Sequence, residues 1–138
     1  MKRLLETYTL NHDYAALFLR LIIGGFFIHY GFGKIQMWDQ LKTMFPDYTG
    51  LGSAGSLALL IFAEFGCGLL ILLGCFTRFA IVPIAISMAV AFFVAHADDA
   101  FKDKQIALLY LLLATVVFLM GSGKYSLDHL IFNRNPKE

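Results

Sequence analysis

Two carboxylates and two histidines within or beside the long apolar runs of this sequence are candidates for one site. They are Glu64, His29, His96 and Asp99. An ionisable group at the depth of a membrane core costs about 2.5–3.5 kcal/mol on insertion scales, so each such residue is a candidate functional residue. Carboxylate and imidazole groups gathered in one pocket can bind a polar ligand atom or relay a proton. We therefore predict that these four residues form a ligand-binding or proton-relay site.

Glu64 is the leading candidate because it lies ten residues into an apolar run that begins at Ala54. A carboxyl group at that depth is either neutral or ionised beside a cation or a strong hydrogen-bond donor. Two interpretations stay open at this point. Glu64 either belongs to a functional site or cross-links two helices without a further role.

Geometry distinguishes two alternative partners for Glu64, which are His29 and Arg20. Helical side chains lean toward the N-terminus of their own helix. If Glu64 and His29 stand on antiparallel helices, their side chains lean toward each other across a depth difference of roughly 8 Å, at 1.5 Å per residue. Arg20 leans away and is expected to extend to the lipid headgroups. The sequence therefore predicts a Glu64–His29 pair.

The same four residues are also candidates for a metal site, because imidazole and carboxylate ligands suit zinc or iron. Their spacing follows neither an HxxH nor an ExxH pattern, so a metal is not expected and His96 is interpreted as an interfacial histidine. Cys67 and Cys75 are eight positions apart. On a helix their Cα atoms would be about 12 Å apart, too far for a disulfide.

Four long apolar runs must position these side chains. The chain has 138 residues, of which 59% are apolar, and its mean hydropathy is +0.70, whereas soluble domains are about 45–50% apolar. Each run approaches the roughly 20 residues that cross a membrane core. The runs are residues 14–32, 54–74, 79–97 and 105–120. We predict an all-α membrane protein, one domain over residues 1–138, folded as an antiparallel bundle of four transmembrane helices.

The connections and one helical face add detail to this bundle. Residues 33–53 are expected to be a long loop, whereas residues 75–78 are so few that the flanking helices must form a hairpin. One stripe of the first helix carries small residues that allow another helix to approach closely. The stripe consists of Arg20, Gly24, Phe27, Gly31 and Lys34. His29 lies on the opposite face, which is predicted to border a cavity.

The distribution of Lys and Arg predicts the orientation. Four spans place both termini on one side, with seven Lys and Arg against four on the other. The seven are Lys2, Arg3, Arg20, Arg78, Lys124, Arg134 and Lys137. The four are Lys34, Lys42, Lys102 and Lys104. Both termini are therefore predicted to be cytoplasmic, in a bacterial inner membrane.

Several polar residues are interpreted as structural. These are Arg20, Arg78, Lys124 and Asp128. Ser126 is a candidate N-cap for a short C-terminal helix that contains Leu127, Leu130 and Ile131. That helix is expected to lie flat at the membrane interface.

Three segments together resemble the DoxX family of small membrane proteins. They are LRLIIGGFFIHYGFGKI, AEFGCGLLILLGCFTRFA and GSGKYSLD, and they stand in the family's order over roughly Phe18 to Asp128. The resemblance implies a four-helix membrane bundle. It also implies kinship with relatives linked to thiosulfate–quinone oxidoreduction or to membrane-associated oxidative-stress complexes.

Three functions are compatible with these features. The first is an accessory or scaffold subunit of a larger membrane complex, in contact with lipid and with a partner membrane protein or a second copy. The alternative is a quinone-linked redox subunit, in which Glu64 and His29 bond a quinone oxygen or relay protons while a partner supplies electrons. The third is a small-molecule transporter that acts as an oligomer. Nearly balanced charge, 11 Lys and Arg against 10 Asp and Glu, argues against nucleic acid as a partner, and the sequence leaves open whether the chain is an enzyme.

Overall fold

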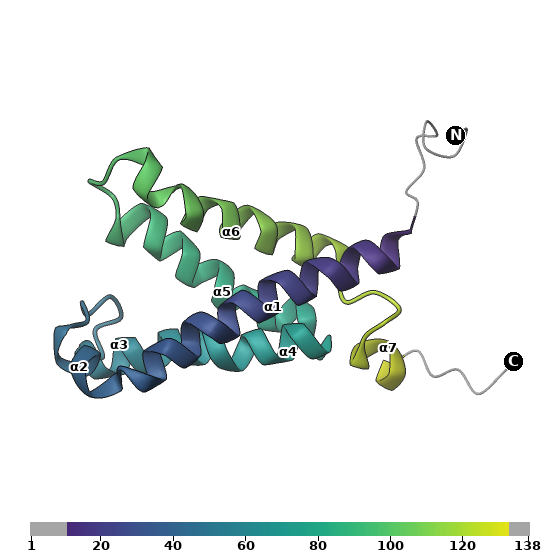
Figure 1. The fold of residues 1–138 in the computed structure, drawn as a ribbon, viewed down its shortest axis with the longest axis horizontal. Coiled ribbons are helices and arrows are strands. Elements are labelled where there is room, and N and C mark those ends of the chain that lie inside the picture. Colours follow the sequence, from purple (N-terminus) through teal and green to yellow (C-terminus); the bar gives the residue numbers. More distant parts are fainter. Residues whose placement is uncertain (1–10, 133–138) are drawn as a thin grey trace, which may run out of the picture.

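The computed structural model describes residues 11–132, which form an all-helical antiparallel bundle (Figure 1). The elements are α1 (His12–Gln36), α2 (Trp38–Met44), α3 (Gly52–Ile61), η2 (Phe62–Gly66), α4 (Cys67–Leu73), α5 (Thr77–Val90), η3 (Ala91–Ala95), α6 (Phe101–Met120) and α7 (Leu127–Phe132). Four units are long and apolar enough to cross a membrane, namely α1, α3–η2–α4, α5–η3 and α6. The predicted four-helix membrane architecture is confirmed.

The first connection differs from the predicted loop. The first helix continues to Gln36, and α2 occupies residues 38–44 of the expected loop. This segment contains Gln, Leu, Lys and Met, which all favour helix, so leaving the apolar region does not end the helical backbone. The predicted hairpin between the second and third spans is present. Gly74, at φ +71°, ends α4, and α5 begins at Thr77.

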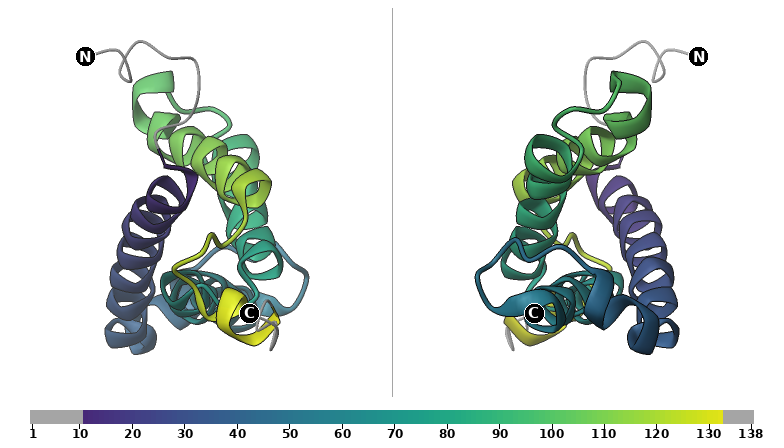
Figure 2. Two further views of the ribbon diagram at one scale, coloured as in Figure 1. Left: turned by 90° about the vertical axis from the view of Figure 1, so that its right-hand side faces the viewer. Right: turned by 90° about the vertical axis from the view of Figure 1, so that its left-hand side faces the viewer.

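The bundle opens toward one end. In Figure 1, α5 and α6 diverge from α1 and α3 at the end that carries α2, and Figure 2 shows α1 and α6 as the two sides of an arch. We call this end, with α2, residues 45–52 and the connection 96–100, the α2 end. The opposite end, with residues 74–77 and 121–132, is the α7 end. The spans therefore lie further apart at the α2 end than at the α7 end.

Glycines bring α1 against the second span at backbone distance. A Cβ placed on Gly31 would lie 2.7 Å from the backbone nitrogen of Phe65, and one on Gly24 would lie 2.9 Å from that of Leu72. On α4, a Cβ placed on Gly68 would lie 3.2 Å from the backbone nitrogen of Ile28. The predicted packing stripe of α1 is thus confirmed, because its members from Arg20 to Gly31 are buried. Small residues at a membrane-helix crossing permit this contact.

Apolar side chains cover most of the remaining surface. The buried core joins α1, α4, α5 and α6 around Phe27, Ile71 and Ile84. Only 11% of the apolar window of α6 is buried, and large apolar residues are exposed on every span. Such a surface suits contact with membrane lipid rather than water.

Substitution of Gly31 tests the glycine contact. We expect Gly31→Ala to lower stability by about 1–3 kcal/mol because the added methyl group meets backbone that cannot rotate away. Thermal unfolding in mild detergent measures this change. Gly33→Ala is the matched control, since a Cβ there meets nothing within 4 Å, and it should be neutral or stabilising by up to about 1 kcal/mol. Equal melting temperatures for the two variants would contradict the contact.

Candidate functional site

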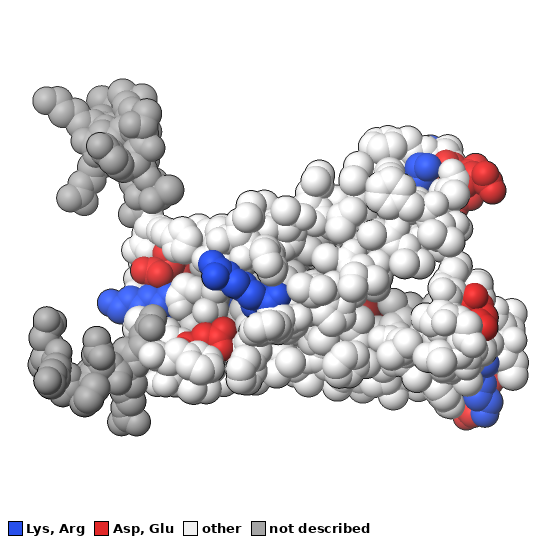
Figure 3. Space-filling view, turned by 180° about the vertical axis from the view of Figure 1, so that it is seen from behind, with Lys and Arg blue, Asp and Glu red and all other residues white. Residues whose placement is uncertain are grey.

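A cavity of about 660 Å³ lies at the α2 end between the second and third spans. Most of its lining is apolar, and Figure 3 shows a hollow between two lobes at this end of the molecule. The polar side chains of the lining are Lys34, Tyr48, Thr49, Ser56, Glu64, Ser87 and His96. An apolar cavity with a few polar groups is typical of a small-molecule site. The cavity occupies the half of the bundle in which the sequence predicts a ligand site.

Glu64 and Lys34 form an ion pair in the wall of this cavity. The Lys34 Nζ donates to Glu64 Oε2 at 2.7 Å, and the side chains are 26% and 5% exposed respectively. The predicted Glu64–His29 pair is therefore wrong, and Arg20 is not the partner either. Lys34 stands on the packing stripe, one turn beyond Gly31, which contacts Phe65 beside Glu64. The packing of α1 against the second span thus determines the partner of Glu64, and the tilt of side chains toward the helix N-terminus does not.

Two π-helical segments line the cavity from opposite sides. Glu64 lies in η2 and Ala95 lies in η3, and both residues line the cavity. A π-helical turn inserts an extra residue into an α-helix and is frequent at functional sites. The sequence prediction of uninterrupted helices missed both segments. A span that is apolar on all sides carries no periodicity from which such an insertion can be read.

The other three members of the predicted site are not all brought together. His96 lines the cavity, and its Nδ1 lies 2.6 Å from Asp99 Oδ2 in a half-exposed pair. Asp99 lies outside the lining, and His29 is exposed on α1 beside Tyr30. Within residues 11–132, no three His, Cys, Asp or Glu residues are grouped as metal ligands. The structure therefore places Glu64 and His96 in one cavity and leaves His29 apart.

A carboxylate-centred loop borders the cavity at the α2 end. The Asp47 carboxylate accepts hydrogen bonds from Ser56 Oγ at 2.8 Å and from the backbone N–H groups of Thr49, Gly50 and Gly52. These hydrogen bonds hold the pKa of Asp47 below its ordinary value, and the bond from Ser56 has the largest effect. Thr49 and Ser56 also line the cavity. Asp47 was missed at the sequence level, although its position between a proline and two glycines is typical of a turn.

Arg20 organises the α7 end. It is 1% exposed, so the expectation that it extends to the headgroups is wrong. Its guanidinium donates to the carbonyl oxygens of Tyr125 and, at 3.5 Å, Ile71. Gly74 leaves the space for it, because a Cβ there would lie 2.1 Å from Nη1. Arg20 thus binds the C-terminal segment to the bundle.

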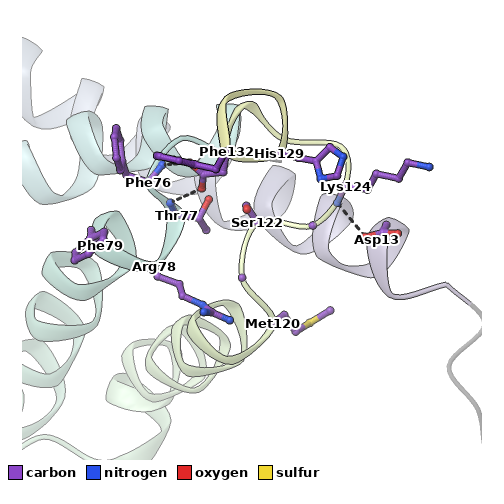
Figure 4. A pocket seen from close by; sticks show the side chains of 13 residues that line it. Asp13, Phe76, Thr77, Arg78, Phe79, Met120, Ser122, Lys124, His129 and Phe132 are labelled. Atoms are coloured by element: carbon purple, nitrogen blue, oxygen red, sulfur yellow. Dashed lines mark hydrogen bonds between the residues drawn. The ribbon is translucent and has the colours of Figure 1, made fainter. Parts of the chain in front are cut away.

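The C-terminal segment also contacts the start of α5, as the dashed lines at Phe76 and Thr77 in Figure 4 show. Asp128 accepts from the backbone N–H groups of Phe76, at 2.7 Å, and Thr77, at 3.2 Å, at the start of α5. Ser126 Oγ accepts from the His129 N–H at 3.2 Å, which confirms it as the N-cap of α7. These contacts agree with the structural interpretation of Asp128.

Arg78 and Lys124 also contribute to this end. The Arg78 Nε donates to the carbonyl oxygen of Phe118 at 3.1 Å, near the C-terminus of α6. The Lys124 backbone N–H donates to Asp13 Oδ1 at 2.9 Å. Arg78 therefore meets orphan carbonyls of a helix end, whereas Lys124 uses its backbone and leaves its side chain exposed.

Comparison with known proteins adds a family and a relative. The family model described as DoxX matches residues 15–97. An uncharacterized protein of Haemophilus influenzae is 30% identical over 139 residues, covering 94% of this chain and 98% of the relative. No solved structure matches this chain. The matched region contains most of α1 and all of the second and third spans, and so includes Lys34, Glu64 and His96.

Removal of Lys34 should cost more than removal of the charge on Glu64. Lys34→Met leaves a carboxylate buried without a cation, which costs about 3 kcal/mol, whereas the lysine left by Glu64→Gln can extend to the nearby α2 end. The double variant should recover most of the lost stability. A double-mutant cycle of thermal unfolding measures the coupling, and additive effects would contradict an energetically significant pair.

Acid should weaken the loop around Asp47. Because the folded-state pKa lies below the unfolded value, the stabilisation is present above about pH 4 and is lost as the pH falls through the lower folded-state pKa. We expect Asp47→Asn to melt at a lower temperature than the wild type at pH 7, with the difference shrinking toward pH 3. Asp98→Asn, which removes an exposed charge on the α5–α6 connection, is the control. A difference independent of pH would contradict this role.

Proposed function

The chain belongs to the DoxX family, and from this premise we propose that it is a quinone-binding accessory subunit of a membrane complex. The α2-end cavity would hold a lipid-soluble quinone, and a partner protein would supply the electrons. The observation that supports this proposal is the Lys34–Glu64 pair in the wall of an otherwise apolar cavity. It is the second of the three functions compatible with the sequence, and we favour it because the cavity offers space for such a ligand.

The cavity has the size and chemistry that such a ligand requires. Its volume of about 660 Å³ lies within the roughly 300–1,000 Å³ of small-molecule pockets. A quinone ring needs apolar walls, and its carbonyl oxygens need donors. Lys34 is such a donor, held in place by Glu64. The quinone itself would accept electrons and protons when bound.

Proton transfer to and from the bound quinone would use Glu64, Lys34 and His96. A carboxylate bonded to an ammonium can return or accept a proton as the charge of the neighbouring ligand changes. His96 lines the same cavity and bonds Asp99, which is half exposed at the α2 end. The proposed route therefore runs from solvent through Asp99 and His96 to the cavity. His29, exposed on α1 and outside the lining, has no part in it.

A scaffold function without a ligand is the second candidate. The observation that favours it is α6, of whose apolar window only 11% is buried. Such a helix offers a long face to a partner membrane protein or a second copy.

We further propose that the protein lies in a bacterial inner membrane with both termini in the cytoplasm. Lys2, Arg3, Arg134 and Lys137, on which that orientation depends, lie outside the described residues.

Extraction of lipid-soluble ligands tests the quinone proposal. We expect the full chain, purified in mild detergent, to carry close to one quinone per chain, measured by solvent extraction and native mass spectrometry. Glu64→Gln and Lys34→Gln should reduce this occupancy at least fivefold, because the first loses the carboxylate and the second the donor.

Lys42→Gln is the control for loss of a lysine at the same end, since Lys42 pairs with Asp39 outside the cavity. Its occupancy should equal that of the wild type. Folding of every variant is checked by thermal unfolding. Absence of quinone from the wild type, or equal occupancy in folded Glu64→Gln, would contradict the proposal and leave the scaffold function.

A further inference from the structure

A second cavity of about 660 Å³ lies at the α7 end, far along the spans from the Lys34–Glu64 pair. It is bordered by the start of α5, the end of α6 and α7, as Figure 4 shows. Because α5 begins and α6 ends here, this cavity is at the depth of lipid headgroups rather than acyl chains. The proposed quinone site does not include this cavity.

The cavity contains two cationic side chains on different elements. Arg78 lies between the ends of α5 and α6 in Figure 4. Its Nε and Nη2 donate to the carbonyl oxygens of Phe118 and Leu119. Lys124 lies at the opposite rim. Within the described residues its ammonium makes no hydrogen bond or ion pair, while its backbone is fixed by Asp13. One cation is thus held in place and the other is free to move onto a ligand.

The carboxylates of the lining are already engaged. Both oxygens of Asp128 accept backbone N–H groups of α5, and this carboxylate also interacts electrostatically with Arg20. Asp13 Oδ1 accepts from the Lys124 N–H. The lining thus has two cations, Arg78 and Lys124, and two carboxylates. Arg20 lies outside the lining, but its charge offsets that of Asp128, so the surroundings of the cavity retain an excess of positive charge.

Aromatic side chains occupy the remainder of the wall. Phe79 is 79% exposed, and the exposed rings of Phe76 and Phe132 meet edge to face at 6.0 Å. These rings offer apolar surface to glycerol and acyl carbons, which a free phosphate ion lacks. The combination of cations and exposed rings fits an amphipathic anion.

We propose that this cavity binds the headgroup of an anionic phospholipid, with its phosphodiester between Arg78 and Lys124 and its glycerol and acyl carbons against the phenylalanines. A planar guanidinium is a strong partner for phosphate oxygens, and a lysine adds a mobile point charge. The bound lipid would join α5, α6 and the C-terminal segment at the α7 end.

Lipid binding to the purified full chain tests the proposal. Native mass spectrometry is performed after delipidation and addition of phosphatidylglycerol, phosphatidylcholine or glycerol 1-phosphate. We expect phosphatidylglycerol to bind at least fivefold more tightly than phosphatidylcholine and to raise the melting temperature. Lys124→Gln should weaken binding at least threefold. Lys102→Gln, which removes the same charge at the α2 end, should leave it unchanged.

Arg78→Lys supplies a second variant, because Arg78→Gln would also remove contacts that end α6. It should retain the fold and lose part of the preference for phosphatidylglycerol. Equal binding of the two phospholipids, or equal effects of Lys124→Gln and Lys102→Gln, would overturn the proposal. Binding of glycerol 1-phosphate as tight as that of phosphatidylglycerol would also overturn it, since the site would then recognise a free phosphate ester.

Discussion

The backbone contact between α1 and the second span is the constraint on which both polar ends of the molecule depend. Gly24 and Gly31 have no side chain where α4 and η2 approach, so the two helices meet at backbone distance. The charged members of the same stripe, Arg20 and Lys34, are then carried to opposite ends of one interface. Each is brought against a group that only the partner helix or the C-terminal segment can supply. A larger residue at either glycine would separate these charges from their partners.

The two charged side chains buried within residues 11–132 have different kinds of partner. Glu64 has an ionic partner in Lys34, at the wall of a cavity that opens toward one end. Arg20 has carbonyl oxygens of Ile71 and Tyr125, with Asp128 as a nearby opposite charge. A buried charge without such partners would cost several kcal/mol, on the order of 3–5. At the α7 end, Arg20 consequently holds the C-terminal segment against the bundle, while divergence of α5 from α3 at the α2 end leaves space beside Glu64.

This asymmetry separates two kinds of chemistry within a small bundle. The α2 end has an ion pair, a histidine and apolar walls, which suit a lipid-soluble ligand with polar oxygens. The α7 end has cations beside exposed aromatic rings at headgroup depth, which suit an amphipathic anion. The π-helical segments lie on the α2-end cavity and not on the α7-end cavity. Helix irregularity is therefore found beside the cavity that lies between two spans, and capping contacts are found at the α7 end, where the helices begin and end.

The sequence by itself determined the four spans, the short hairpin, the packing stripe of α1 and Ser126 as the cap of α7. These features follow from local patterns, namely apolar run length, helical spacing of small residues and the side chain that precedes a helix. It also singled out Glu64, because an acid in an apolar run is conspicuous.

Only the tertiary structure decided which residues Glu64 and Arg20 meet. Lys34 was already on the packing stripe, but pairing also depends on the rotation of one helix about another, on the extension of α1 to Gln36 and on the π-helical turn that contains Glu64. Arg20 found its partners in Ile71 and Tyr125, 51 and 105 residues away. Contacts of that kind are set by three-dimensional packing, and no spacing along a single helix encodes them.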